Sequence, residues 1–167
     1  MTKTILQQTL LFFAFVFLQV CCFNRVHIFG YATPIVYSYF ILKLPVKLNR
    51  NYVILIAAAM GFIIDIFCST PGLNMLSMVF VGFVRYWLIK LFIPKDMTDD
   101  GIPSFETFGM PLFMRYATIA VIFHIALLLI FETLSLLNPL MLFAHITGSA
   151  ILTALLIFAF EKIHLPA

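Results

Sequence analysis

Charged residues are scarce in this chain, because Asp, Glu, Lys and Arg together make up only 10% of its 167 residues. Apolar residues make up 63%, with 20 phenylalanines among them, and the mean hydropathy is +1.11. A soluble protein of this composition would expose large apolar patches to water. We therefore expect an all-α, polytopic membrane helix bundle, with residues 1–167 forming a single integral membrane domain.

Short motifs of common enzyme chemistry are also missing. The sequence has no His-Glu-x-x-His zinc motif, no Gly-x-Ser-x-Gly turn and no phosphate-binding glycine loop. Three cysteines, Cys21, Cys22 and Cys68, give neither the spacing of metal ligands nor an even number for disulfides. These absences predict a protein that is not an enzyme and holds no metal or cofactor.

Runs of Lys and Arg are absent despite the net charge of +3, so no nucleic-acid partner is predicted. The one long hydrophilic stretch is Pro94–Gly109. Its acidic residues Asp96, Asp99 and Asp100 do not follow the spacing of a calcium loop. We expect this stretch to be a solvated cytoplasmic connector.

Long apolar runs predict six transmembrane helices: Ile5–Phe23, Tyr31–Leu44, Tyr52–Phe67, Gly72–Phe92, Pro111–Leu134 and Leu140–Phe160. The second run has only 14 residues, which as a helix reach about 21 Å, short of a core of about 30 Å. This run either crosses a thinned bilayer or dips in and returns, which would leave five spans. Its aromatic residues at both ends favour a crossing.

The distribution of basic residues predicts the topology, because cytoplasmic loops accumulate Lys and Arg. With six spans and cytoplasmic termini, only Arg25 lies outside, and the cytoplasmic ends hold the other nine: Lys3, Lys43, Lys47, Arg50, Arg85, Lys90, Lys95, Arg115 and Lys162. In a five-span topology with the N-terminus outside, Arg25 lies inside and Lys3 outside, so nine basic residues are again cytoplasmic and one is not. Charge therefore fixes the topology from Tyr52 onward and leaves the first 50 residues open.

Asp65 is a carboxylate inside an apolar run, close to the predicted turn at Pro71-Gly72. A charge at the bilayer centre costs about 2.5–3.5 kcal/mol, so this residue needs a polar surrounding. It could form a pocket with Asn74, His124 or His145, cap the hairpin by accepting backbone N–H bonds, or remain protonated. Arg85 differs from it in depth by about 10 Å, so we expect no tight ion pair and an Arg85 side chain that extends to the cytoplasmic surface.

Two pairs of small residues predict contact faces between helices. Ala57 and Gly61 form one small-xxx-small pair, and Ala144 and Gly148 form the other. Such pairs let a second backbone approach closely.

The central stretch resembles a known family. Leu44-Pro45 is followed by basic residues and Asn49, then by Gly61-Phe62-Ile63-Ile64-Asp65, Pro71-Gly72-Leu73-Asn74 and an apolar run with Arg85. In this order the residues are similar to those of the rod shape-determining membrane protein family MreD, best over residues 34–85. The resemblance makes Gly61, Asp65, Gly72, Asn74 and Arg85 the structural or functional candidates.

The resemblance implies a non-catalytic scaffold in the cytoplasmic (inner) membrane of a bacterium. Such proteins bind MreC and belong to the cell-elongation machinery of peptidoglycan synthesis, with MreB, RodA and a class B penicillin-binding protein. The family also resembles, in its six-helix arrangement, the substrate-binding S components of energy-coupling-factor vitamin transporters, which is the alternative function.

Three functions make different predictions for the extracytoplasmic end. A scaffold should be packed shut there, whereas a substrate-binding subunit should enclose a pocket near Asp65, Asn74 and His145. A membrane enzyme would bring His124 or His145 within hydrogen-bond reach of Asp65 in a hydrated cavity.

Overall fold

The computed structural model describes residues 2–25, 32–92, 101–132 and 139–164, which contain no β-strand. The helices are α1 (Thr2–Cys21), the short 3-10 helix η1 (Phe23–Arg25), α2 (Ser38–Leu42), α3 (Arg50–Cys68), α4 (Leu73–Phe92), α5 (Phe105–Phe108), α6 (Met110–Glu132) and α7 (Pro139–His164). The all-helical class predicted from the sequence is confirmed. Five of the six predicted runs correspond to a long helix, with ends displaced by a few residues.

Apolar length identifies the membrane-spanning part of the fold. Among the described residues, α3, α4, α6 and the stretch Leu142–Ile163 of α7 are long and apolar enough to cross a membrane, and α1 adds a shorter apolar stretch, Leu6–Cys21. Their outer faces expose large apolar side chains, including Leu10, Phe17, Leu55, Phe62, Leu91, Phe143 and Leu155. Such faces are stable in lipid and not in water, so this is a membrane protein.

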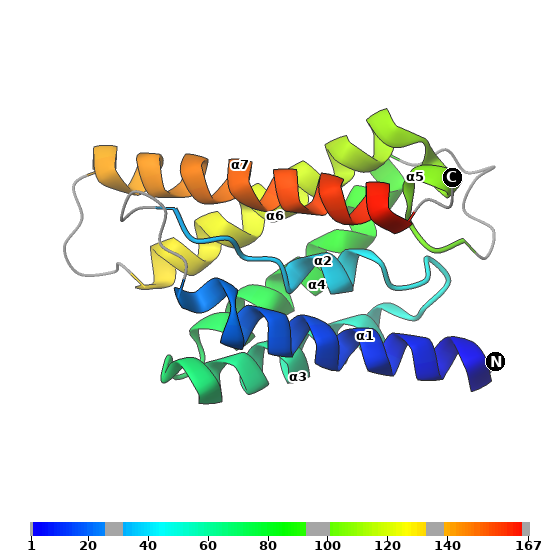
Figure 1. The fold of residues 1–167 in the computed structure, drawn as a ribbon, viewed down its shortest axis with the longest axis horizontal. Helices are drawn as coiled ribbons and strands as arrows, with labels where there is room; N and C mark the ends of the chain where they lie inside the picture. Colours follow the sequence, from blue (N-terminus) through cyan, green and yellow to red (C-terminus); the bar gives the residue numbers. More distant parts are fainter. Residues whose placement is uncertain (1, 26–31, 93–100, 133–138, 165–167) are drawn as a thin grey trace.

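The long helices run antiparallel along one axis (Figure 1). At one end, called here the terminal end, α1 begins, α4 ends and α7 ends. At the opposite end, called here the cavity end, α1, α3 and α6 end while α4 and α7 begin. The turn between α3 and α4 therefore lies at the cavity end, and α5, between α4 and α6, lies at the terminal end.

The prediction of a second helix over Tyr31–Leu44 is wrong. Its described part begins with an extended stretch over residues 32–36, and only Ser38–Leu42 are helical. The segment passes through the bundle from the cavity end to the terminal end (Figure 1). Extended chain rises about 3.3 Å per residue against about 1.5 Å in a helix, so this run covers more distance than its length as a helix would allow.

Polar side chains of two helices satisfy the backbone of the extended stretch. Gln19 on α1 accepts a hydrogen bond from the Val36 N–H at 2.9 Å and donates one to the Pro34 carbonyl at 3.1 Å. From α7, Thr153 accepts from the Ile35 N–H at 3.0 Å and Ser149 from the Thr33 N–H at 3.1 Å. Non-helical backbone is tolerated at membrane depth only where protein groups pair with it, and here they do.

The small-residue pair of α7 is only half confirmed as a contact face. A Cβ added to Gly148 would lie 3.2 Å from the Cβ of Ala32, so this glycine packs against the extended stretch. Ala144, by contrast, is exposed. The pair therefore supports the second segment at one position and faces outward at the other.

Candidate functional site

Helices α3 and α4 form a closely packed hairpin. A Cβ added to Gly61 would lie 2.5 Å from the Cα of Met75, a separation that real atoms do not adopt. One turn earlier on the same face of α3, Ala57 is fully buried, and a Cβ on Gly82 of α4 would lie 3.3 Å from its side chain. The predicted contact face of Ala57 and Gly61 is confirmed, and its partner is α4 of the same chain.

Asp65 caps the first turn of α4. Its Oδ1 accepts hydrogen bonds from the Asn74 backbone N–H, the Asn74 side-chain amide and the Thr70 hydroxyl, and its Oδ2 accepts from the Met75 backbone N–H, all at 2.9 Å. The first N–H groups of a helix have no partner inside the helix and favour negative charge. Of the three roles open to Asp65, the geometry is that of the hairpin cap.

The turn between the two helices depends on backbone geometry that suits few residues. Ser69 ends α3 in the left-handed conformation with φ of 55°, and its N–H bonds to the Asp65 carbonyl. Gly72 precedes α4 with φ of 81°, a value that side chains with a Cβ adopt rarely. The predicted turn residue Gly72 thus lies where glycine is favoured.

A buried polar chain continues inward from Asp65. Asn74 accepts a hydrogen bond from the Tyr37 hydroxyl at 2.6 Å, and the same hydroxyl lies 3.2 Å from Nε2 of His124. Both Tyr37 and His124 are almost fully buried, and within the described part of the chain Nδ1 of His124 has no hydrogen-bond partner. His124 therefore reaches Asp65 through two intermediate side chains and does not meet it in a shared cavity, as the enzyme hypothesis requires.

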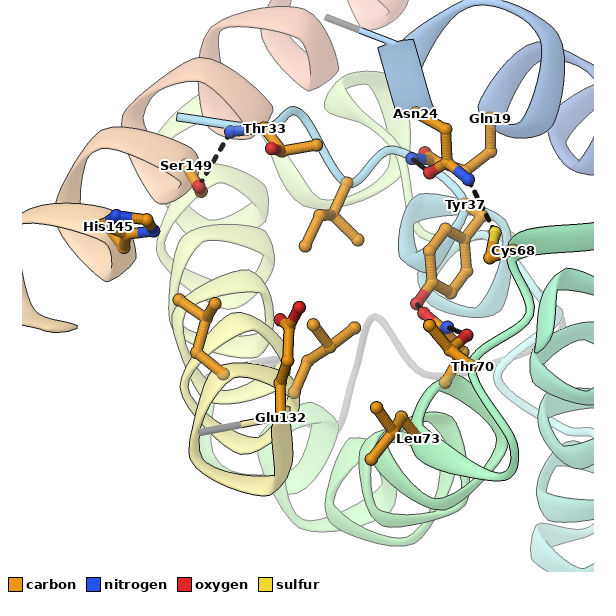
Figure 2. Close-up of a pocket in the computed structure, with 14 residues that line it drawn as sticks. Gln19, Asn24, Thr33, Tyr37, Cys68, Thr70, Leu73, Glu132, His145 and Ser149 are labelled. Carbon is orange, nitrogen blue, oxygen red and sulfur yellow. Dashed lines mark hydrogen bonds between the residues drawn. The ribbon is translucent and has the colours of Figure 1, made fainter. Parts of the chain in front are cut away.

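A cavity of about 400 Å³ opens at the cavity end of the bundle (Figure 2). Its wall is formed by side chains of α1, η1, α3, α4, α6, α7, the second segment and the turn between α3 and α4: Gln19, Asn24, Thr33, Ile35, Tyr37, Cys68, Thr70, Leu73, Asn74, Leu128, Leu129, Glu132, His145 and Ser149. The candidates Asn74 and His145 line it. Asp65 does not line it but fixes Thr70 and Asn74, which do.

Arg85 lies toward the other end of the bundle and does not extend to the surface as predicted. It is 3% exposed, and its guanidinium donates hydrogen bonds to the carbonyl oxygens of Leu44 and, at 3.5 Å, Pro45. The hydroxyl of Tyr116 donates to the Leu42 carbonyl at 3.4 Å beside it. Arg85 pairs with backbone carbonyls just after the helical part of the second segment, so acceptors inside the protein take the place of the membrane surface. The expected absence of an ion pair with Asp65 agrees with this placement.

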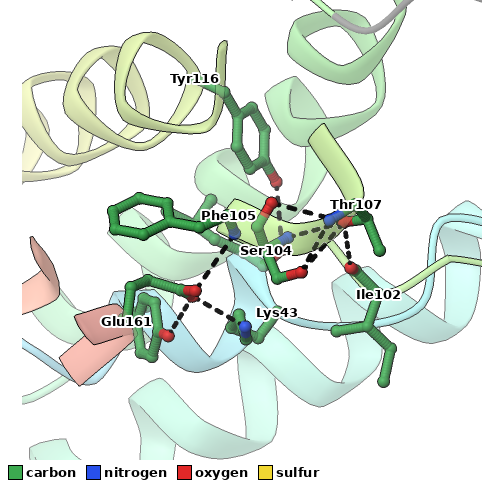
Figure 3. A network of polar contacts seen from close by, with 9 residues as sticks. Lys43, Ile102, Ser104, Phe105, Thr107, Tyr116 and Glu161 are labelled. Atoms are coloured by element: carbon green, nitrogen blue, oxygen red, sulfur yellow. Dashed lines mark hydrogen bonds and ion pairs between the residues drawn. The ribbon is translucent and has the colours of Figure 1, made fainter. Parts of the chain in front are cut away.

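Glu161 joins three segments at the terminal end (Figure 3). This buried carboxylate of α7 accepts hydrogen bonds from the Tyr39 hydroxyl and the Phe105 N–H at 3.3 Å, and pairs with Lys43 at 2.7 Å. Burial of such a charge requires several donors, and Glu161 has three. Glu161 is not among the residues predicted from the sequence, because Glu161-Lys162 follows an apolar run and resembles the exposed end of a helix.

The connector Pro94–Gly109 is only partly as expected. Residues 94–100, with Lys95, Asp96, Asp99 and Asp100, lie outside the described residues. In the described half, Gly101 accepts from the Val46 N–H, and Phe105 and Phe108 of α5 are buried. Ser104 and Thr107 form the capping box that begins α5. This half is packed against the bundle and is not a solvated loop.

Comparisons with known proteins add no constraint, since no family model, no curated protein and no solved structure matches the chain. Across the described ranges, no group of three His, Cys, Asp or Glu residues could hold a metal ion. The site is therefore defined by its own geometry: a capped hairpin, a buried polar chain and a cavity at one end of the bundle.

Proposed function

We propose that this protein is a non-catalytic membrane scaffold of the MreD kind, which binds MreC in the bacterial cytoplasmic membrane. One observation supports this most: four of the five residues of the resemblance make internal contacts, and the fifth, Gly72, forms the turn between two of the helices. Gly61 permits the close helix pair, Asp65 and Asn74 cap it, Gly72 forms its turn and Arg85 holds the second segment. Residues that fix a shape, and expose no reactive group, suit a scaffold. Through MreC it would belong to an assembly with MreB, RodA and a class B penicillin-binding protein.

The proposed topology has six crossings with both termini in the cytoplasm. Five crossings are helical, and the second is made by the partly extended segment, whose backbone is paired with Gln19, Ser149 and Thr153. The start of α1 and the end of α7 share the terminal end, as an even number of crossings requires. Most basic residues of the described chain also lie toward that end, which supports a cytoplasmic location for it.

A groove between α1 and α3 offers a site for the single transmembrane helix of MreC. The docking groove has a volume of about 470 Å³ and an almost wholly apolar wall: Gln8, Thr9, Phe12, Phe13, Phe40, Leu44, Pro45, Leu48, Ile56 and Ala59. Oε1 of Gln8 is buried in this wall and has no hydrogen-bond partner among the residues that the structure describes. An unpaired acceptor at membrane depth favours a polar partner helix over a lipid tail, which has no donor to offer.

Two matched alanines test the docking groove. Ala59 lines it, and Ala159 is exposed on α7 outside it. Ala59→Phe should fill the groove and reduce recovery of co-expressed MreC at least tenfold after mild detergent extraction, whereas Ala159→Phe should leave recovery unchanged. Equal recovery with both variants would refute the groove as the docking site, and no recovery even with the unmodified protein would refute the scaffold function.

A second candidate function is a substrate-binding membrane subunit resembling the S components of energy-coupling-factor transporters. The observation that favours it is the cavity of about 400 Å³, since the scaffold hypothesis expected that end to be packed shut. Its size falls within the range of about 300–1,000 Å³ typical of small-molecule sites. Equilibrium dialysis of the purified protein against labelled vitamins tests it: tight binding of one vitamin supports this function, and no binding leaves the cavity to another ligand.

A further inference from the structure

The polar wall of the cavity is largely satisfied by its own hydrogen bonds. Gln19 pairs with the extended stretch, Asn24 donates to the sulfur of Cys68, and Asn74 accepts from Tyr37. These groups hold the wall together and have little capacity left for a ligand. A side chain that binds a ligand in this cavity must therefore have a donor or acceptor that is not already used within the wall.

Glu132 is such a residue. It lies at the end of α6, and Figure 2 shows its carboxylate pointing into the space of the cavity. Among the described residues, this carboxylate has neither a hydrogen bond nor an ion pair, in contrast with Asp65 and Glu161. No other Asp, Glu, Lys or Arg of the described ranges is part of the lining. Within that lining Glu132 is the one carboxylate, and a carboxylate without a protein donor favours a cation with N–H donors.

The remainder of the lining limits the kind of cation. Calcium and magnesium need about six oxygen ligands, mostly carboxylates and carbonyls, and a single carboxylate is a poor site for them. Leu73, Leu128 and Leu129 form an apolar part of the wall of the same cavity. A volume of about 400 Å³ exceeds that of a hydrated ion and suits an organic molecule. The ligand should therefore combine a charged amine with an apolar portion.

We propose that the cavity is a binding site for a primary ammonium group attached to an apolar body, held by Glu132 and the three leucines. This chemistry has two sources at a membrane surface: a free amine, or the headgroup of phosphatidylethanolamine. The inference goes beyond the MreC scaffold and does not depend on it, and it specifies a ligand class for the cavity. Its test uses ligand binding alone, so its failure is distinguishable from a failure to recover MreC.

The experiment uses the full chain in phosphatidylcholine nanodiscs, with thermal unfolding followed as three amines are titrated: 2-phenylethylamine, lysine and spermidine. At saturation, 2-phenylethylamine should raise the unfolding midpoint by about 5 °C, and uncharged 2-phenylethanol should not. Glu132→Gln should weaken the apparent affinity at least tenfold. The matched control Glu106→Gln, which alters an exposed carboxylate of α5, should leave the affinity unchanged.

A lipid arm separates the two sources. Replacing half of the phosphatidylcholine with phosphatidylethanolamine should raise the midpoint and weaken competition by 2-phenylethylamine if the headgroup is the ligand, and should change neither if it is a free amine. Because Glu132 is exposed, Glu132→Gln should unfold at the same temperature as the unmodified protein without amine. If no amine and no phosphatidylethanolamine shifts the midpoint, or if Glu132→Gln binds as tightly, the proposal is wrong.

Discussion

Glu161 and Glu132 are carboxylates of neighbouring long helices, yet the two ends of the bundle use them differently. At the terminal end Glu161 is 2% exposed and receives Tyr39, Lys43 and the Phe105 N–H. At the cavity end Glu132 is exposed, faces about 400 Å³ of open space and has no partner in the described chain. At the terminal end the carboxylate of Glu161 joins three segments, whereas at the cavity end the carboxylate of Glu132 is free to bind another molecule. This contrast suggests that the terminal end fixes the shape of the bundle while the cavity end can receive a ligand.

The α3–α4 hairpin shows that part of the cavity end is closely packed. Asp65, Asn74 and Gly61 hold its α3–α4 corner in close contact. The opening lies beside this corner, among α1, α6, α7 and the extended stretch. A rigid corner beside an open space is the arrangement of a preformed binding site.

The largest effect should come from breaking the corner itself. Asp65→Leu leaves the buried N–H of Asn74 and the partly buried N–H of Met75 without their acceptor, and a buried unpaired donor costs about 1–3 kcal/mol. We expect a loss of about 3–5 kcal/mol of unfolding free energy and little protein in the membrane. Protein level and the unfolding midpoint in detergent measure this effect. A normal protein level and a normal unfolding midpoint would show that Asp65 does not stabilise the α3–α4 hairpin.

Glu161→Leu should be nearly as damaging at the terminal end. It leaves Lys43 and Tyr39 without their carboxylate, and we expect a loss of about 2–4 kcal/mol. Glu106→Leu is the control at the same end, because Glu106 is exposed, and it should change stability by less than about 0.5 kcal/mol. Equal midpoints for the two variants would show that the terminal end is not held by Glu161.

Loss of the side-chain pairing of the extended stretch should lower the unfolding free energy by a smaller amount. Gln19→Leu removes the partners of the Val36 N–H and the Pro34 carbonyl, and should cost about 1–3 kcal/mol. Gln7→Leu makes the same change at an exposed position of α1 and should be close to neutral. Unfolding midpoints of the pair in the same detergent check this expectation. A neutral Gln19→Leu would mean that the extended stretch needs no side-chain pairing.

Tyr37→Phe should have the smallest effect, about 1 kcal/mol, because it deletes one hydroxyl that bonds to Asn74 and contacts His124. Tyr52→Phe, at an exposed position of α3, is the control and should not alter the midpoint. A loss above about 3 kcal/mol would instead indicate that the polar chain from Asp65 to His124 acts as one cooperative unit.

Local patterns in the sequence predicted much of this structure, and contacts between distant segments account for the rest. Apolar length located five long helices, and the Ala57–Gly61 spacing identified a real contact face. The second run failed because its apolar character reflects burial inside the protein, which lets an extended chain replace a helix there. Composition alone cannot separate these two cases.

The same reason explains the polar residues that were misjudged or missed. Asp65 stood out because it interrupts an apolar run, and its partners Thr70, Asn74 and Met75 are local. Gln19 and Glu161 bond to residues that are distant in sequence, up to 122 positions away for Glu161 and Tyr39. The sequence does show Gln19 as a polar side chain near the end of an otherwise apolar helix, but it gives no sign of the backbone groups that Gln19 bonds to.

Labelling of single cysteines tests the contrast between the two ends most directly. On a background with Cys21, Cys22 and Cys68 replaced by alanine, Glu132→Cys places a thiol at the cavity end and Glu106→Cys one at the terminal end. A maleimide that cannot cross the cytoplasmic membrane should label Glu132→Cys in intact spheroplasts and label Glu106→Cys only after lysis. Labelling of Glu106→Cys in intact spheroplasts, with Glu132→Cys protected, would contradict the proposed orientation and the outward cavity with it.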